Sequence, residues 1–271
     1  MPPSVRLPVC QVGDPTWFSF KAAVCLAAAT GMRIDEFISN GSWSKKDGSR
    51  AHLTWIFEGR RRTWLSKSDL LKLGPGDSAV VMPMPAKADR YLKYFGSKPM
   101  YFPFTKSCFN AAAALRDLEL SFPVPHLSRD NYPFIPNGHI KRAWTESELR
   151  NTFKAALIVA VPKQEAKLYS WHSFRVYLAC AMQVLGCSDS LVQAFVRWRS
   201  PKSVPYYQRL GRHQYEDMMR RVADVVVDAG CLERMPVISE ETQLVETMGM
   251  LPAVGLAEDE VDGWESDPEE D

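Results

Sequence analysis

The sequence predicts an α+β fold that is mostly helical, with a small antiparallel β-sheet or hairpin on one side. Two Ala-rich apolar runs, residues 17–30 and 106–118, are typical of buried helices. Two runs rich in β-branched and aromatic residues, 51–57 and 78–104, favour strands because such side chains fit a pleated surface. The chain has 271 residues, of which 46% are hydrophobic and 24% charged, which is ordinary for one or two globular domains.

The N-terminal part is expected to hold an arm, a helix and a hairpin. Residues 1–15 are rich in Pro and form the arm, and Gly31 ends the helix over 17–30 because glycine suits a left-handed C-cap. After the strand over 51–57, three consecutive arginines are expected to form a basic turn, which either contacts phosphate or belongs to a plain solvated hairpin. They are Arg60, Arg61 and Arg62.

A second hairpin is expected within residues 78–104, after the chain breakers Gly74–Pro75–Gly76. Pro83 and Pro85 predict that it lies at the edge of a sheet, because proline has no N–H to donate to a neighbouring strand. A loop rich in Pro, Asn and Gly is expected over residues 121–138.

The rest of the chain predicts a series of helices. Thr145 and Glu148 match a capping box for a helix to about residue 161. Ser170 is the expected N-cap of the next helix, which Gly186 would end. A further helix is expected from Ser188 to Trp198. Residues 213–229 predict an amphipathic helix packed on the body, with its apolar face at Met218, Val222, Val225 and Val226.

Charge is distributed unevenly along the chain. Residues 1–230 hold 32 bases and 19 acids, whereas residues 231–271 hold one base and 13 acids. A basic body of this kind suits a phosphate-backbone partner. The tail loses periodicity from Ser239 and is expected to be disordered beyond about Gly255. It either mimics DNA and screens the basic surface or simply aids solubility.

The composition argues against membrane, zinc and disulfide classes. No apolar run approaches the roughly 20 residues of a membrane span. The six cysteines form no CxxC pair, which favours reduced, mostly buried thiols in an intracellular protein. The five histidines show no metal-ligand spacing.

The most informative segment is residues 169–210. His172 and Arg175 are three residues apart at the start of an apolar helical run, so their side chains share one face of its first turn. Trp198 follows Arg175 by 23 residues, and Tyr207 follows Trp198 by nine. Each feature alone is common in proteins, but the joint spacing is far more specific.

These spacings resemble the C-terminal motifs of the tyrosine recombinases, the phage integrase family. That family also carries an arginine in a TGxRxxE turn, which Arg33 and Glu36 match, and a lysine in a β-hairpin, which Lys87 matches. Arg33 could instead simply complement a helix end. Lys93 and Lys98 are alternatives to Lys87.

The resemblance covers about residues 16–232 and implies a catalytic domain alone, followed by an acidic tail over 233–271. The separate N-terminal DNA-clamping domain of the family has no counterpart before Arg33, which weakens the expectation of full activity. Pro205 sits awkwardly in a helix and leaves Tyr206 as an alternative nucleophile.

The resemblance implies DNA strand cleavage and rejoining through a 3′-phosphotyrosyl intermediate. Tyr207 would attack phosphorus, Lys87 would protonate the leaving 5′ hydroxyl, and the other four side chains would bind the phosphate oxygens. Those four are Arg33, His172, Arg175 and Trp198. No metal or other cofactor is needed. DNA contacts are further expected from Arg60, Arg61, Arg62, Arg197, Arg199 and Lys202.

The implied partner is double-stranded DNA, with assembly into a tetramer on paired sites as a further expectation. Location in the nucleus of a eukaryote, or otherwise in the cytoplasm, would follow. Two alternatives stay open: a decayed or co-opted mobile-element remnant that binds DNA without catalysis, and an unrelated helical interaction protein. Type IB topoisomerases share this chemistry, but the compact C-terminal spacing favours the recombinases.

Overall fold

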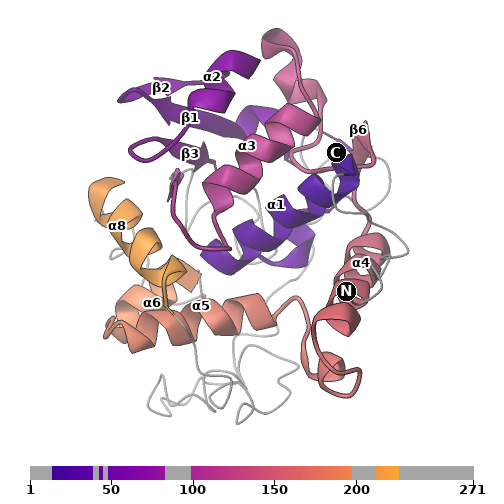
Figure 1. The fold of residues 1–271 in the computed structure, drawn as a ribbon, viewed down its shortest axis with the longest axis vertical. Helices are drawn as coiled ribbons and strands as arrows, with labels where there is room; N and C mark the ends of the chain where they lie inside the picture. The colour runs from indigo at the N-terminus through magenta and orange to yellow at the C-terminus, as the bar shows by residue number, and fades with distance from the viewer. Residues whose placement is uncertain (1–13, 39–42, 45–47, 83–98, 197–211, 226–271) are drawn as a thin grey trace, which may run out of the picture. The chain divides into compact units, whose positions relative to one another are not determined.

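The structure is a computed structural model that describes residues 14–38, 43–44, 48–82, 99–196 and 212–225 (Figure 1). All of these residues belong to one compact unit that spans residues 1–227. The expected N-terminal arm, apart from its last two residues, and the acidic tail lie outside the described residues.

The fold is α+β and mostly helical, which confirms the predicted class. The α-helices are α1 (Pro15–Thr30), α2 (Lys67–Lys72), α3 (Ala111–Ser121), α4 (Glu146–Ala160), α5 (Ser173–Val184), α6 (Asp189–Val196) and α8 (Arg212–Ala223). The strands are β1 (Leu53–Phe57), β2 (Arg60–Arg62), β3 (Ser78–Val81), β4 (Met100–Pro103), β5 (Pro136–Asn137) and β6 (His139–Ala143). Short 3-10 helices are η1 (Ile34–Glu36), η3 (Arg50–His52), η4 (His126–Asn131) and η5 (Glu165–Leu168).

The main sheet has four antiparallel strands in the order β2-β1-β3-β4. The turn between β1 and β2 consists of Glu58 and Gly59, with φ angles of 51° and 74°. Positive φ at both positions is typical of the tight turns that match strand twist. The predicted place of the three arginines in the turn is therefore wrong, because they form an edge strand after it, but the alternative of a solvated hairpin agrees with their exposure.

The second predicted hairpin is present as β3 and β4, but its predicted place at the sheet edge is wrong for β3. That strand pairs with β1 on one side and with β4 on the other. All four of its residues are buried. Because β3 ends at Val81, Pro83 and Pro85 fall after the strand and do not interrupt its pairing. They lie outside the described residues, in the connection that also carries Lys87.

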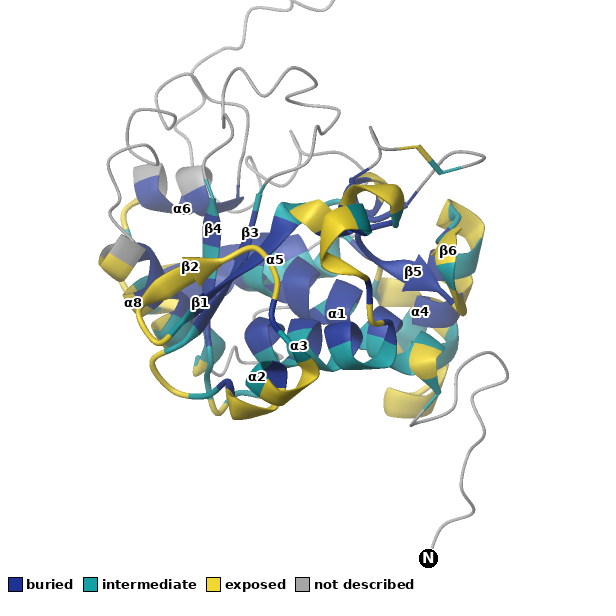
Figure 2. Cartoon of the chain, turned by 90° about the horizontal axis from the view of Figure 1, so that it is seen from above, coloured by how far each residue is buried: buried dark blue, intermediate teal, exposed yellow. Residues whose placement is uncertain are grey.

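The two faces of the sheet contact different helices. Ser78 and Tyr101 lie on the face that α8 covers, where the Ser78 hydroxyl donates to Glu216 Oε1 at 2.7 Å. The rings of Tyr101 and Tyr215 are 6.4 Å apart. Helix α3 contacts β3 and β4 as well, and it packs along α1 (Figure 1). The sheet is thus buried against helices, and Figure 2 shows β2 as its exposed edge.

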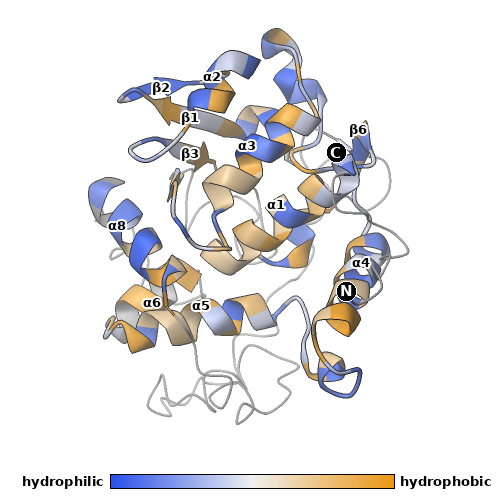
Figure 3. Ribbon diagram, in the orientation of Figure 1, coloured by the Kyte–Doolittle hydropathy of each residue, from blue (hydrophilic) through white to orange (hydrophobic). Residues whose placement is uncertain are grey.

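Helix α1 is the centre of the helical part. Nine of its residues are buried, and both α3 and α5 contact it. Asp14 is its N-cap and Pro15 occupies the first turn. Gly31 ends it with φ 62°, as predicted, and donates its N–H to the carbonyl of Ala27 at 2.8 Å. Figure 3 shows how apolar α1 and the adjoining part of α3 are.

Local signals set most helix ends. Thr145 and Glu148 form the predicted capping box, and α4 stops at Ala160, two residues before Pro162. Helix α3 begins after the N-cap Asn110, later than predicted, because the Asn110 side chain accepts from Ala113 N–H. The expected loop over residues 121–138 contains η4 and β5.

The start of α5 differs from the prediction. Ser170 is not its N-cap, since residues 171 and 172 form a turn and the helix begins at Ser173. Gly186 follows the helix with φ 71°, as predicted. Ser188 starts α6, where its hydroxyl accepts from Leu191 N–H at 3.4 Å.

Helix α8 packs on the body, as expected for an amphipathic helix. The predicted face is only partly right, because the buried apolar residues are Tyr215, Met219 and Val222, whereas Met218 is half-buried. The Tyr215 ring stacks on Phe195 of α6 at 4.9 Å. This stacking joins α6 to α8.

Candidate functional site

The turn after α1 holds the first arginine of the candidate site. Arg33 precedes η1, and its backbone N–H donates to Glu36 Oε2 at 2.7 Å. Glu36 is buried, with 3% of its surface exposed, while the Arg33 side chain is half-buried. The carboxylate of Glu36 thus fixes the backbone that presents Arg33. That Glu36 supports Arg33 within a catalytic site stays a prediction of the sequence.

The second arginine motif lies directly against this turn. A Cβ added to Gly31 would meet Arg175 Cγ at 3.1 Å, a tight contact that glycine avoids, and glycine also suits the positive φ of 62° at this position. The Trp171 indole N–H donates to the carbonyl of Met32 at 3.2 Å. The structure therefore brings residues 31–36 and the start of α5 together, although about 140 positions separate them.

An aromatic cluster supports the same junction. The Trp171 ring lies 5.7 Å from Phe37, 5.7 Å from Phe153 and 5.4 Å from Phe174. Trp171 itself is only 5% exposed. Because edge-to-face ring pairs add to the burial of apolar surface, the turn, α4 and α5 form one packed support. His172 is held beside it, half-buried in the turn before α5.

Arg175 is buried, with 3% of its surface exposed. Its Nη2 donates to the backbone carbonyl of Val196, at the last described residue of α6. A cation at this place complements the helix dipole. The same contact sets the position at which the chain enters residues 197–211.

Three predicted catalytic residues lie outside the described residues: Lys87, Trp198 and Tyr207. The same holds for Tyr206, Lys93, Lys98, Arg197, Arg199 and Lys202. Described neighbours flank each stretch: β3 and β4 enclose residues 83–98, and α6 and α8 enclose residues 197–211. The stacked rings of Phe195 and Tyr215 hold the two ends of the second stretch close together.

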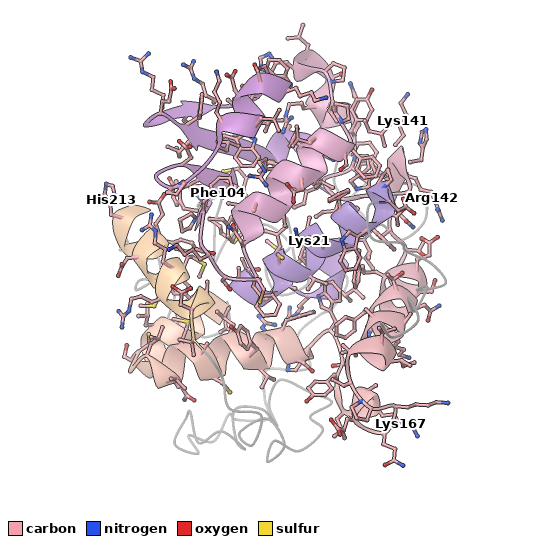
Figure 4. The ribbon with its side chains drawn as sticks, viewed as in Figure 1. Lys21, Phe104, Lys141, Arg142, Lys167 and His213 are labelled. Carbon is pink, nitrogen blue, oxygen red and sulfur yellow. The ribbon has the colours of Figure 1, made fainter. Side chains whose placement is uncertain are left out.

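The predicted DNA-contacting arginines of β2 are all exposed. Arg61 Nε donates to the hydroxyl of Thr54 at 3.2 Å. Arg60 and Arg62 make no side-chain hydrogen bond or ion pair to the rest of the described chain. Other basic side chains, such as Lys141, Arg142 and Lys167, also extend outward from the body (Figure 4).

A buried charge cluster that the sequence analysis did not predict lies beside the sheet, and we call it the arginine clamp. It consists of Glu119 on α3, Arg50 on η3 and Arg129 on η4. Arg129 makes two bonds to the Glu119 carboxylate, at 2.7 and 3.0 Å, and two more to the carbonyls of Arg50 and Leu53. Arg50 Nη1 lies 3.5 Å from Glu119 Oε1. Burial lowers the pKa of Arg50, and the Glu119 carboxylate opposes this shift.

Contacts between separate elements create this cluster, so no helical or strand spacing could have revealed it. Glu119 is 69 positions from Arg50 and ten from Arg129, and charged residues are exposed by default. Because the clamp joins α3, η3 and η4, it fixes the loop over residues 121–138 against β1.

The described cysteines divide into two classes. Cys25 and Cys180 are buried, but Cys108 is exposed and Cys187 is half-buried, so the expectation of mostly buried thiols is only partly right. Burial raises the pKa of Cys25 to about 12. Within the described ranges, no group of three or more His, Cys, Asp or Glu side chains could hold a metal ion.

Comparisons with protein-family models, with curated proteins and with solved structures found no match to this chain. Among the described helices, none is long and apolar enough to cross a lipid bilayer.

Proposed function

We propose that this protein cleaves and rejoins DNA strands through a 3′-phosphotyrosyl intermediate, as the tyrosine recombinases do. The observation that carries the proposal is the packing of the Arg33 turn against the start of α5, where His172 precedes the helix and Arg175 lies in its first turn. The resemblance to the tyrosine recombinases implies that Arg33 and Arg175, which are distant in the sequence, bind the same phosphate. The contact between Gly31 and Arg175 is consistent with that requirement.

The proposed chemistry follows from the demands of phosphoryl transfer. The Tyr207 oxygen attacks phosphorus, the bond from phosphorus to the 5′ oxygen breaks, and Lys87 protonates that oxygen as it leaves. Charge on the non-bridging oxygens is offset by Arg33 and Arg175, because guanidinium forks make paired, permanently charged bonds to phosphate. His172 and Trp198 add further donors. Rejoining reverses each step.

The buried state of Arg175 is part of the proposal. Its guanidinium donates to the carbonyl of Val196. Binding of DNA would replace this carbonyl with a phosphate oxygen and move the end of α6, to which the segment with Tyr207 is attached. Access of the phosphate and placement of the nucleophile would then be coupled.

The bond between Arg175 and Val196 also suits a second function. If this bond persists when DNA is bound, Arg175 cannot bind the phosphate, and the protein is a remnant of a mobile element that binds DNA without cleaving it. The basic body would still attract the phosphate backbone through counterion release. The two functions differ in whether a covalent adduct forms.

A nicked suicide substrate separates these functions. After cleavage, the short fragment that carries the free 5′ hydroxyl leaves the duplex, so the strand cannot be rejoined. The protein stays attached to the 3′ phosphate, and the full-length chain gains the mass of the DNA in a denaturing gel. We expect the adduct with the native chain and with Tyr206→Phe, but not with Tyr207→Phe or Arg175→Gln. DNA binding without an adduct in the native chain would support the remnant.

A further inference from the structure

Strand β2 and the residues that follow it form an unusual surface at the free edge of the sheet. The side chains of Arg60 and Arg62 are exposed and have no hydrogen-bond or ion-pair partner among the described residues. Both alternate with Arg61 along the strand, so they point to the same side. Two guanidinium groups in this state are available to an anionic partner.

An exposed aromatic pair follows directly. Trp64 is 40% exposed, which is unusual for an indole, and its ring lies 5.9 Å from that of His126 with 30° between the planes. The Thr63 hydroxyl lies 3.1 Å from His126 Nε2, which fixes the imidazole. Leu127 beside it is 93% exposed. We call Trp64 and His126 the aromatic pair.

The arginine clamp holds this pair in place. Arg129 lies three residues after His126 in η4, and its guanidinium bonds to Glu119, to the carbonyl of Arg50 in η3 and to that of Leu53 at the start of β1. Trp64 follows β2, which pairs with β1. Trp64 and His126 are therefore both attached to β1, one through β2 and the other through η4, so the pair is preorganised and loses little entropy on binding.

Sheet-edge protection is the simplest explanation of the arginines alone. Charged residues on an edge strand prevent pairing with other chains. That explanation does not account for the tryptophan, because an exposed indole beside an edge would favour association. A partner that needs both cations and a flat aromatic surface accounts for both features.

Nucleic acid with unpaired bases meets both needs. Phosphates pair with guanidinium groups, and a base that is not stacked in a duplex can stack on an aromatic ring. An intact duplex offers the phosphates but hides its base faces. We propose that Arg60, Arg62 and the aromatic pair bind a single-stranded stretch of nucleic acid. This deepens the proposed function, because strand exchange requires DNA strands to separate.

The first experiment measures binding of oligo-dT, about 15 nucleotides long, and of a hairpin duplex to full-length protein that carries Tyr207→Phe. We expect Trp64→Ala to weaken binding of oligo-dT about tenfold, and that of the duplex less than about twofold. Trp64→Phe should retain most of the affinity. Leu71→Ala, at a residue that is 64% exposed on α2, serves as the matched control and should have no effect.

The second experiment tests the cations. Arg60→Gln/Arg62→Gln should reduce the salt dependence of oligo-dT binding by about 1.4 in the slope of log K against log salt, since each phosphate contact contributes about 0.7. Lys163→Gln/Lys167→Gln removes the same charge from an exposed site and should leave the slope nearly unchanged. Equal losses in both double variants would show a general charge effect and overturn the proposal.

Loss of oligo-dT and duplex binding to the same degree in Trp64→Ala would also overturn it, as would unchanged affinity for both. Because the native tyrosine is replaced throughout, these results are independent of cleavage. If the native chain forms no covalent adduct but Trp64→Ala still weakens only oligo-dT binding, the proposed catalysis fails and the single-strand site stands.

Discussion

Two groups of arginines in this molecule differ in what surrounds them. Arg50 and Arg129 are buried, and both approach the carboxylate of Glu119. Arg60 and Arg62 are exposed on the edge strand without a partner in the described structure. The same side chain thus stabilises the fold in one place and remains available to a ligand in the other. Surroundings, and not residue type, decide the role.

Arg175 falls between these groups. It is as buried as Arg129, yet it donates to the carbonyl of Val196, which a ligand oxygen can replace. Arg129 instead makes two bonds to the carboxylate of Glu119, at 2.7 and 3.0 Å. The two buried arginines therefore differ in one described partner of the guanidinium, a backbone carbonyl for Arg175 and a carboxylate for Arg129.

The largest expected effect comes from the arginine clamp. Glu119→Gln leaves two buried guanidinium groups without a carboxylate, and we expect a loss of about 3–5 kcal/mol in the free energy of unfolding. Glu146→Gln, which breaks an exposed pair with Arg150, should cost less than about 0.5 kcal/mol. Denaturant unfolding of the full chain measures both. Similar small losses would show that the clamp is not structural.

A smaller effect is expected at the junction of the two arginine motifs. Gly31→Ala should cost about 2 kcal/mol, because its φ is 62° and the added methyl meets Arg175 Cγ at 3.1 Å. Gly186→Ala has a similar φ of 71° but nothing within 4 Å, so it reports the backbone cost alone, about 1 kcal/mol. The difference between the two losses measures the packing against Arg175. Equal losses would show that close packing of Gly31 against Arg175 does not contribute to stability.

The exposed arginines should contribute little to stability. Arg60→Gln/Arg62→Gln is expected to change the free energy of unfolding by less than about 0.5 kcal/mol, as surface substitutions usually do. The same denaturant unfolding measures this change. A loss above about 1 kcal/mol would mean that β2 needs these side chains to fold, and would weaken their assignment to a ligand.

The same contrast between buried and exposed groups applies to two thiols. Because burial raises the Cys25 pKa from 9.0 to about 12, the folded thiol stays protonated while the unfolded one ionises. Stability from this group is complete below pH 9 and declines as the pH rises toward 12. Alkylation followed by mass spectrometry at pH 8 should modify Cys108 well before Cys25. Equal rates would contradict the burial of Cys25.

Local signals predicted the helical frame well. Gly31 ends α1, and the Thr145 and Glu148 pair starts α4, because each depends on residues within one turn. The position of the β1–β2 turn and the end of β3 could not be predicted from local signals. The sequence did not show that Glu58 accepts a positive φ, which moves the turn ahead of the arginines, or that β3 ends before Pro83.

The residues of the candidate site could be proposed from their spacing in the sequence, but the contacts between them could not be predicted. Nothing local relates Gly31 to Arg175 or Met32 to Trp171, so the junction emerges only when α1 packs on α5. The arginine clamp was missed for the same reason. Its three charged residues belong to α3, η3 and η4, and the sequence offers no period that unites them.

The most direct test of the proposed catalysis is to identify the residue that carries DNA. The native chain is reacted with the suicide substrate, digested with protease and nuclease, and analysed by mass spectrometry for a peptide that bears a phosphodiester-linked nucleotide. We predict attachment at Tyr207, with loss of the adduct when Arg33 or Arg175 is changed to Gln. Attachment at a residue outside 197–211, or an adduct that persists without either arginine, would contradict the account.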